Sequence, residues 1–374
     1  MFIKRQLEQN IEKWLFKGKI IILYGPRQVG KTTLSKKLIE KYGDKSSYIN
    51  CDDIYNKQQL EIPNAGHLKK FLGNSRFFVF DEAQRIRNIG LTLKLLIDTF
   101  PELQIVATGS SSFDLSNKVN EPLTGRALEF ILYPFSYSEL SEAFSSRETH
   151  SSLEHLLRFG SYPTVVNKTE SESVTLLKNL ASQYLYKDIF EFEEIRKPDL
   201  LLKMLQLISF QIGNEVSIHE LAVKLEVSTK LVSKYLDLLE KVFVIFRLGA
   251  LSRNPRNEIT KKKKIYFYDL GVRNILIQRM TSLEIRDDIG TLWENFCVLE
   301  RKKKLHYEEN FANQYFWRSQ SGSEIDYVEE SEGKINGYEF KWSKDKIRIP
   351  ELFVKKYKAT VNLITKDNFD EFVL

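Results

Sequence analysis

Residues 25–33, with the sequence GPRQVGKTT, constrain the fold of this chain more than any other stretch. They fit the pattern G-x-x-x-x-G-K-[ST] through Gly25, Gly30, Lys31 and Thr32. An apolar, β-branched run of strand length precedes them, and the residues that follow carry apolar side chains at helical spacing. The order strand, glycine-rich loop, helix predicts an α/β fold with a parallel sheet and a phosphate-binding loop.

A loop of this kind turns backbone N–H groups inward at a helix N-terminus, where the positive end of the helix dipole favours phosphate. We expect Lys31 to reach the β- and γ-phosphates of ATP and the Thr32 hydroxyl to bind Mg²⁺. ATP and Mg²⁺ are therefore the expected cofactors. The nucleotide-binding residues expected from the loop are Gly25, Pro26, Arg27, Gln28, Val29, Gly30, Lys31, Thr32 and Thr33.

A second pattern is the run of four apolar residues at 77–80, which leads directly into Asp81 and Glu82. The carboxyl ends of parallel strands meet at the ligand edge of a sheet, so both acids are expected beside the loop. Asp81 is expected to bind Mg²⁺, and Glu82 is the natural base for polarising an attacking water. Alone, such an acid pair more often caps a helix, so this interpretation depends on the preceding loop.

Two further features follow along the chain. A buried strand expected at residues 103–111 ends in small polar residues, of which Thr108 or Ser110 is expected to contact the γ-phosphate; a serine-rich turn is the alternative. Arg126 precedes the next strand. We expect it to be buried beside the sheet, where it serves as an arginine finger or sensor, or else pairs with Glu129 or another acid.

Composition sets the class of protein. The 374 residues are enough for two or three domains, and 42% hydrophobic with 28% charged residues is typical of soluble globular proteins. The formal net charge of +6 permits a nucleic-acid partner without requiring one. Cys51 and Cys297 have no metal-binding or disulfide spacing, which favours a reducing, cytoplasmic setting. Residues 1–16 read as an amphipathic helix, and no apolar run reaches membrane-spanning length.

The middle of the chain reads as mainly helical to residue 211, which suits a lid over the nucleotide. A short helix at 218–225, a tight turn, a helix at 229–241 and a strand then predict a winged helix-turn-helix. Its second helix would present Lys230 and Lys234 to a DNA major groove, with Arg253 and Arg256 near the wing. Asp237 and Glu240 on the same helix weaken this signal, and winged helices also serve as packing modules.

The last third carries acids on a helix and two strands: Glu294, Asp326, and Glu339 with Lys341. Residues two apart in a strand share a face, so Glu339 and Lys341 are expected side by side. Two carboxylates and a lysine can bind Mg²⁺ and position hydroxide for phosphodiester cleavage, with Asp326 and Glu339 as the metal ligands and Glu294 as a fourth member. The alternative is a solvated, salt-bridged sheet face. The lysine run 261–264 is expected to be a solvated loop, or else to bind nucleic-acid phosphates without sequence preference.

The succession of motifs resembles a known family. GPRQVGKTT, FFVFDEAQ, ATGSSS, LTGR, YPFSYSEL, FGSYP, IYFYDLGVRN, LWENF, and EIDYV followed by YEFKW are similar to prokaryotic AAA-superfamily ATPases that carry a C-terminal domain of unknown function. The resemblance covers nearly the whole chain. It implies an AAA-type core, a helical lid leading into a winged helix, and a PD-(D/E)XK-like C-terminal domain. In this chain Ile325, and not proline, precedes Asp326.

These observations predict an ATPase core at 1–135, a helical lid at 136–211, a winged helix at 212–258 and a restriction-endonuclease-like α/β domain at 259–374. We expect a Mg²⁺-dependent ATPase that couples ATP to nucleic-acid binding or processing, with DNA favoured over RNA. The alternative is a slow-hydrolysing nucleotide switch that docks a protein partner, with a nuclease-like domain that does not cleave. An AAA-like core is compatible with a homo-oligomer, and Arg126 would then act in its own protomer or in a neighbour.

Overall fold

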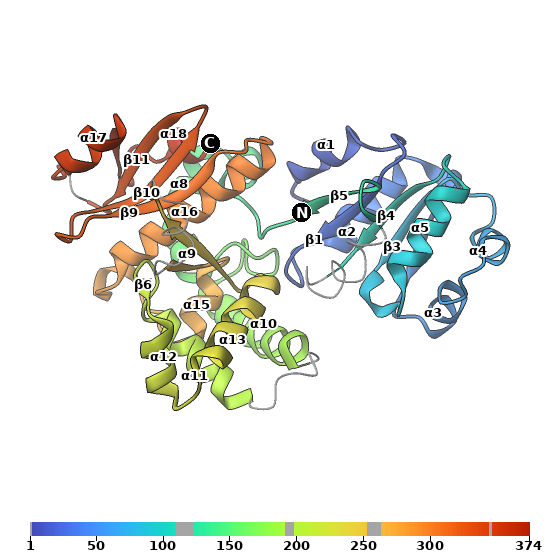
Figure 1. Ribbon diagram of the computed structural model, residues 1–374, viewed down its shortest axis with the longest axis horizontal. Helices are drawn as coiled ribbons and strands as arrows, with labels where there is room; N and C mark the ends of the chain where they lie inside the picture. Colours follow the sequence, from blue (N-terminus) through green and yellow to red (C-terminus); the bar gives the residue numbers. More distant parts are fainter. Residues whose placement is uncertain (1, 110–122, 191–197, 253–262, 344–345) are drawn as a thin grey trace. The chain divides into compact units, whose positions relative to one another are not determined.

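The computed structural model describes residues 2–109, 123–190, 198–252, 263–343 and 346–374. Contacts divide the chain into two units (Figure 1). One comprises Met1–Pro134 with Lys241–Phe243, and the other comprises Phe135–Glu240 with Val244–Leu374. The four domains expected from the sequence, with their three boundaries, stay predictions.

The first unit contains a five-stranded parallel sheet in the order β2-β3-β4-β1-β5. Its strands are β1 (Ile20–Tyr24), β2 (Ser46–Asn50), β3 (Phe77–Asp81), β4 (Gln104–Thr108) and β5 (Ala127–Ile131). Every residue of β1, β3 and β4 is buried, as expected of central strands covered on both faces. The parallel α/β fold predicted from the sequence is confirmed.

The helices of the first unit are α1 (Leu7–Glu12), α2 (Lys31–Glu40), α3 (Ile54–Leu60), α4 (Ala65–Leu72) and α5 (Ile89–Thr99), with short 3₁₀ turns η1 (Gly43–Lys45) and η2 (Ala83–Arg85). The N-terminal helix is shorter than the predicted 1–16. Residues 2–5, which precede α1, are not helical. Arg5 is buried there and donates to the carbonyl of Val29 at 2.8 Å and to that of Tyr133.

The second unit contains a seven-stranded mixed sheet in the order β12-β11-β10-β9-β7-β8-β6. Its strands are β6 (Glu215–Val216), β7 (Ile245–Ala250), β8 (Lys263–Phe267), β9 (Asn313–Arg318), β10 (Glu324–Ser331), β11 (Lys334–Phe340) and β12 (Thr360–Ile364). The strand expected as the wing is β7, which pairs antiparallel with β8 and also parallel with β9. The sheet therefore continues across the boundary expected at residues 258 and 259.

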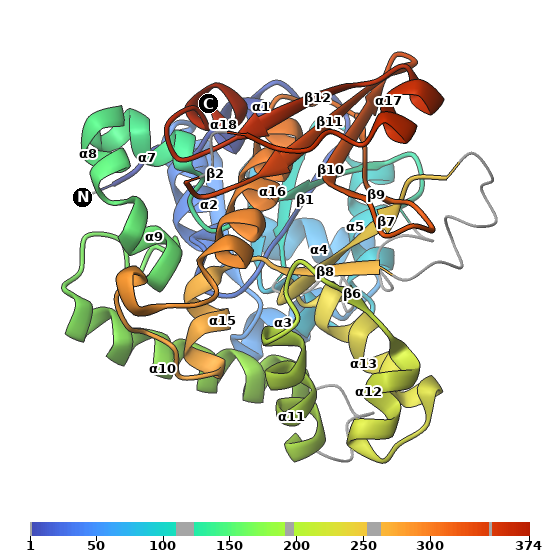
Figure 2. The same ribbon diagram turned by 90° about the vertical axis from the view of Figure 1, so that its left-hand side faces the viewer.

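The helices of the second unit are α7 (Tyr137–Phe144), α8 (Ser146–Ser151), α9 (Leu153–Phe159), α10 (Glu170–Phe190), α11 (Pro198–Ser209), α12 (Ile218–Leu225), α13 (Thr229–Lys241), α15 (Leu270–Leu276), α16 (Ile289–Tyr307), α17 (Glu351–Tyr357) and α18 (Asp370–Val373), with a 3₁₀ turn η3 (Leu283–Ile285). Figures 1 and 2 show α11, α12 and α13 beside one another. The helix α16 packs against β8 and β11. Among the described helices, none is both long and apolar enough to cross a membrane.

The turn after α9 and the start of α15 meet around one buried carboxylate. Asp269 accepts hydrogen bonds from the backbone N–H of Ser161 at 2.8 Å and of Val272 at 3.0 Å. Gly160 has φ +75°, and a Cβ there would lie 2.2 Å from the Asp269 carboxylate; a Cβ on Gly271 would lie 2.0 Å from a backbone oxygen of α9. Both positions therefore require glycine. Burial raises the pKa of Asp269 to about 6, although the backbone N–H groups oppose the shift.

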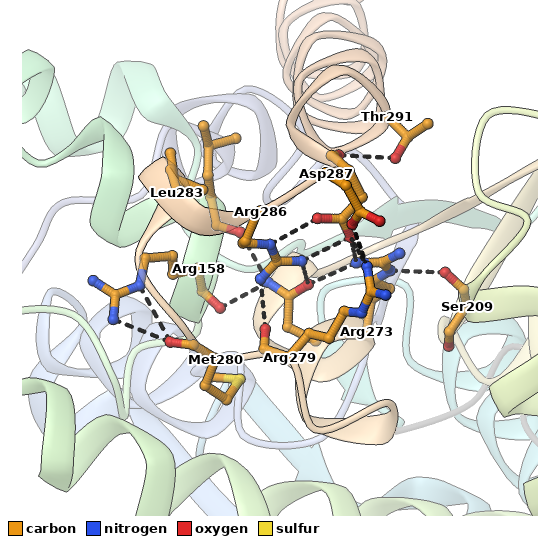
Figure 3. A network of polar contacts seen from close by, with 12 residues as sticks. Arg158, Ser209, Arg273, Arg279, Met280, Leu283, Arg286, Asp287 and Thr291 are labelled. Atoms are coloured by element: carbon orange, nitrogen blue, oxygen red, sulfur yellow. Dashed lines mark hydrogen bonds and ion pairs between the residues drawn. The ribbon is translucent and has the colours of Figure 1, made fainter.

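An arginine network holds the segment between α15 and α16 (Figure 3). Asp288 accepts from Arg273 at 2.6 Å and, through both carboxylate oxygens, from Arg286 at 2.7 and 2.8 Å. Arg273 also donates to the carbonyl of Ser209 at 2.8 Å, which fixes α11 to the same group. Burial opposes ionisation of Asp288, but the two guanidinium groups lower its pKa to about 2.

Candidate nucleotide-binding site and carboxylate cluster

The loop between β1 and α2 has the backbone shape that its sequence predicts. Gln28 and Gly30 have φ of 62° and 98°, and Gly30 is the N-cap of α2. Gly25 has φ 148°, and a Cβ there would lie 2.2 Å from the carbonyl oxygen of Leu132, at the end of β5. The loop therefore passes close to the backbone at the end of β5 and ends at the N-terminus of α2, which is a favourable place for phosphate.

Lys31 lies inside this loop. Its side chain is buried, and its ammonium donates to the carbonyl oxygens of Gly25 and Pro26, each at 2.8 Å. The cation is therefore held next to the loop backbone that is expected to surround a phosphate.

Asp81, the last residue of β3, connects four elements. One carboxylate oxygen accepts from the Thr32 hydroxyl of α2 at 2.8 Å and from the Tyr48 hydroxyl of β2 at 2.5 Å. The other accepts from the Thr108 hydroxyl at the end of β4. The strand order explains this, because β4 lies between β1 and β3 and so brings Thr108 beside the acid.

Tyr48 is a member of the site that the sequence analysis missed. The sequence identified its strand, but the contact depends on β2 lying next to β3 in the sheet, which no local pattern reports. Burial and the hydrogen bond to Asp81 raise the pKa of Tyr48, so the phenol remains a proton donor at neutral pH.

Glu82 leaves the strand in a left-handed conformation, with φ 55° and ψ 42°. Its backbone N–H donates to the Thr108 hydroxyl at 3.2 Å, and its carboxylate accepts from the side-chain amide of Gln84. The side chain is partly exposed at the carboxyl edge of the sheet, where a base for water is expected. Ser110, the other residue expected here, lies outside the described residues.

The residues present fit a Mg²⁺-bound nucleotide. Mg²⁺ takes oxygen ligands and usually retains several waters, so it is bound through few protein groups. The Thr32 hydroxyl and the Asp81 carboxylate, 2.8 Å apart, supply two such oxygens next to the loop. The helix N-terminus and Lys31 supply the positive charge for phosphate.

Arg126 is not where the sequence suggested. The alternative that it pairs with an acid is confirmed, since it lies 2.6 Å from Asp98 of α5. It is partly exposed, with 38% of its side chain accessible, so the expectation of a buried arginine is wrong. The reason is strand direction. Arg126 immediately precedes β5, and its carbonyl accepts from the N–H of Ile20 at the start of β1. The loop lies at the other end of β1, about 16 Å away for a five-residue strand.

Replacing Arg126 by alanine is therefore expected to leave ATP affinity unchanged at protein concentrations where the chain is monomeric. The measurement is equilibrium binding of a fluorescent ATP analogue, with Asp98→Ala as the control that breaks the same ion pair from the other side. Weaker binding by monomeric Arg126→Ala, with Asp98→Ala normal, would show that the arginine reaches its own nucleotide.

The carboxylate cluster of the second unit comprises Glu294, Glu324, Asp326 and Glu339 with the lysines Lys264 and Lys341. The structure thus brings together the four residues expected from the sequence, which are Glu294, Asp326, Glu339 and Lys341. Lys341 lies 3.0 Å from Glu339, as expected for residues two apart that share a strand face. It also lies 3.2 Å from Asp326 of the adjacent strand β10. The pairing of β10 with β9 shifts register between Ile325 and Val328, and this bulge contains Asp326. Bulges commonly redirect a side chain.

Lys264 and Glu324 are the two members that the sequence analysis missed. The lysine run was expected to be solvated, but only 1% of the Lys264 side chain is exposed, and it contacts Glu294 at 2.9 Å and Glu324 at 2.5 Å. Burial and the nearby Asp326 raise the pKa of Glu294 to about 7, although Lys264 opposes the shift. Among the described residues, no group of three or more His, Cys, Asp or Glu has an arrangement that could hold a metal ion.

Comparison with protein families supports the nucleotide-binding fold of the first unit. Residues 17–141 match the family described as AAA domain, while residues 150–283 and 289–367 match two domains of unknown function, DUF8612 and DUF4143. The first match and the loop geometry together support an AAA-type P-loop core at these residues. The expected winged helix and PD-(D/E)XK-like domain stay predictions.

Similar proteins cover most of the chain. An uncharacterized protein of Mycobacterium tuberculosis is 27% identical over 342 residues, covering 90% of this chain and 74% of that protein. One of Methanocaldococcus jannaschii is 26% identical over 357 residues, covering 81% of this chain and 73% of that protein. The RuvB Holliday junction branch migration motor of Thermotoga maritima is similar with 18% identity, covering 68% of this chain and 91% of that one, but its TM-score of 0.35 is too low to inform function.

Proposed function

We propose that this chain is a Mg²⁺-dependent ATPase that couples ATP binding and hydrolysis to the binding or processing of nucleic acid, with DNA favoured over RNA. The observation that carries the ATPase part is the Asp81 carboxylate. It holds Thr32 and Thr108 beside a loop that contains the buried ammonium of Lys31.

Each residue of the site then has a defined role. Lys31 and the N–H groups at the start of α2 bind the phosphates, and Thr32 with Asp81 holds Mg²⁺. Bound Mg²⁺ neutralises charge on the phosphate oxygens. Glu82 accepts a proton from the attacking water, and Thr108 fixes the backbone of Glu82 relative to Asp81.

The helices α12 and α13 support a nucleic-acid contact. Ser217 caps α12, Glu226 ends it in a left-handed conformation, and Ser228 accepts from a backbone N–H in the first turn of α13, giving a helix, a tight turn and a helix. Lys230 and Lys234 on α13 are exposed. This is the arrangement in which a second helix presents cations to phosphates and base edges.

The acids that weakened this interpretation have a partner within the unit. Arg247 of β7 lies 2.7 Å from Asp237 and also pairs with Glu240, while burial of its guanidinium opposes the charge. The two carboxylates thus share one positive charge from the sheet side, which offsets half of their negative charge. The exposed part of α13 is consequently more positive than its sequence suggests, which favours an anionic partner.

The test is steady-state ATP hydrolysis with Mg²⁺, with and without duplex DNA or RNA. We expect stimulation by DNA, and we expect the double variant Lys230→Glu/Lys234→Glu to lose it while keeping its basal rate. The salt dependence of DNA binding should also fall, by about two units of slope for two lost phosphate contacts. Lys355→Glu/Lys356→Glu on α17, an equal charge reversal on an exposed helix of the same unit, should retain stimulation.

A turnover rate indifferent to both nucleic acids at low salt would contradict the coupling. It would leave the ATPase and favour the alternative of a nucleotide switch that docks a protein partner. If the unmodified chain hydrolyses no ATP under any of these conditions, the proposal that it is an ATPase is contradicted.

A further inference from the structure

The ammonium of Lys264 occupies the centre of the carboxylate cluster. It lies 2.9 Å from Glu294 of α16, 2.5 Å from Glu324 and 3.9 Å from Asp326, both of β10. Burial opposes a charged lysine, but these three acids raise the pKa of Lys264 above its ordinary value, so the side chain is a cation at neutral pH. Three carboxylates from two elements thus share one positive charge.

The surroundings leave this cation little freedom to move away. The Glu294 oxygen that accepts from Lys264 also accepts from the buried Tyr266 hydroxyl at 2.7 Å. A Cβ on Gly213 would lie 3.2 Å from the Glu294 carboxyl group, so the backbone there presses against that side chain. The ring of Phe316 lies 5.6 Å from the ammonium, within the range of a cation–π contact.

The other side of the cluster is also occupied by a cation. Asp326 directs its second oxygen at the Lys341 ammonium, 3.2 Å away, and at the backbone N–H of Phe340, 3.0 Å away. Glu339 lies 3.0 Å from the same ammonium. Each acid expected to bind metal is therefore already directed at a lysine.

This arrangement does not fit Mg²⁺. Mg²⁺ requires oxygen ligands at about 2.0 to 2.1 Å in near-octahedral geometry. The expected ligands Asp326 and Glu339 contact the Lys341 ammonium instead. The remaining acids of the cluster, Glu294 and Glu324, contact the Lys264 ammonium. A divalent ion placed among them would also be repelled at short range by a buried positive charge.

We propose that the Lys264 ammonium takes the place of a divalent metal ion in the carboxylate cluster, so that this cluster binds no Mg²⁺ and the C-terminal region does not cleave phosphodiesters. Lys264 is a fixed internal cation that holds α16 to β8 and β10. The region then acts on a nucleic acid or another partner by binding. All the residues involved lie in the second unit, so the inference does not depend on the ATPase assignment.

The test measures Mn²⁺ binding by electron paramagnetic resonance in the nucleotide-free full chain, with Asp81→Asn present throughout to remove the metal ligand of the first unit. The parent, which is the chain with Asp81→Asn as its only change, is expected to bind no Mn²⁺ at the carboxylate cluster. Lys264→Met keeps the length of the side chain and removes its charge, and we expect it to bind one Mn²⁺ per chain at least about tenfold more tightly than the parent. Lys264→Arg, the matched control that retains a cation, should behave as the parent. Adding Glu294→Gln to Lys264→Met should abolish the gained binding.

Two results would overturn the proposal. One is a Mn²⁺ ion bound per chain by the parent and lost on Asp326→Asn. The other is a folded Lys264→Met chain, with an unchanged circular dichroism spectrum, that gains no Mn²⁺. Should Lys264→Met fail to fold, the parent alone decides: absence of bound Mn²⁺ supports the proposal, and an ion that depends on Asp326 contradicts it.

Discussion

Replacing Glu82 by glutamine is expected to lower kcat for ATP hydrolysis by about 10²- to 10⁴-fold, the contribution typical of a general base. Glutamine keeps the size of the side chain and its capacity to hydrogen-bond Gln84, so the left-handed turn after β3 should persist. ATP affinity should remain close to that of the unmodified chain, because the phosphate-binding groups lie on the loop and α2. The result to measure is therefore slow turnover with intact binding.

Asp52→Asn is a matched control for this change. Asp52 is an exposed acid that follows β2 at the same edge of the sheet, where it pairs with Arg85 at 3.0 Å. Its replacement removes an equal charge from the same edge and should leave kcat nearly unchanged. Lys31→Ala provides the opposite comparison, since it should lose ATP affinity as well as turnover. Rapid hydrolysis by Glu82→Gln would show that another group activates the water.

The parts of the ATP site that local patterns define were predictable from the sequence. The glycine loop, the two acids at the end of β3 and the small polar residue at the end of β4 all lie within a few positions of a strand end. Arg126 shows the limit of this reasoning. Being near a strand of the sheet was taken to mean being near the nucleotide, but a residue before a parallel strand lies at the opposite edge from one after it.

The carboxylate cluster shows a second limit. The sequence placed Glu339 and Lys341 on one strand face, because alternation is a local property. It could not show that Lys264 pairs with Glu294 and Glu324, since these contacts join residues 30 or more positions apart across α16, β8 and β10. The run of four lysines suggested solvent exposure, although the last of them lies within a strand and is buried.

The same reasoning applies to Asp269. Two motifs, FGSYP and YDLGVRN, contributed to the family resemblance without any physical role. In the structure they pack on each other, and the glycine of each leaves room for one carboxylate or for a neighbouring backbone oxygen. Such glycines can be recognised in a sequence, but the contact that requires them cannot.

Asp288→Ala is expected to lower the free energy of unfolding by about 3 to 5 kcal/mol, the usual cost of removing one partner from a buried ion pair. Arg273 and Arg286 each have only 2% of their side chains exposed, and both donate to this carboxylate. Alanine would leave two buried guanidinium groups without their shared acid. Chemical unfolding followed by circular dichroism measures the change.

The neighbouring acid supplies the control, and pH supplies an independent check. Asp287 is 82% exposed and pairs only at the surface with Arg279, so Asp287→Ala should cost no more than about 1 kcal/mol. Because the pKa of Asp288 is about 2 in the folded chain and 3.8 when unperturbed, its stabilisation is fully present above about pH 4 and declines as the pH falls toward 2. The stability gap between the unmodified chain and Asp288→Ala should narrow over that interval. Two outcomes would contradict this prediction: Asp288→Ala does not lower the free energy of unfolding at neutral pH, or Asp287→Ala lowers it by the same amount. Either would mean that the arginines find other partners and that Asp288 does not hold α15 to α16.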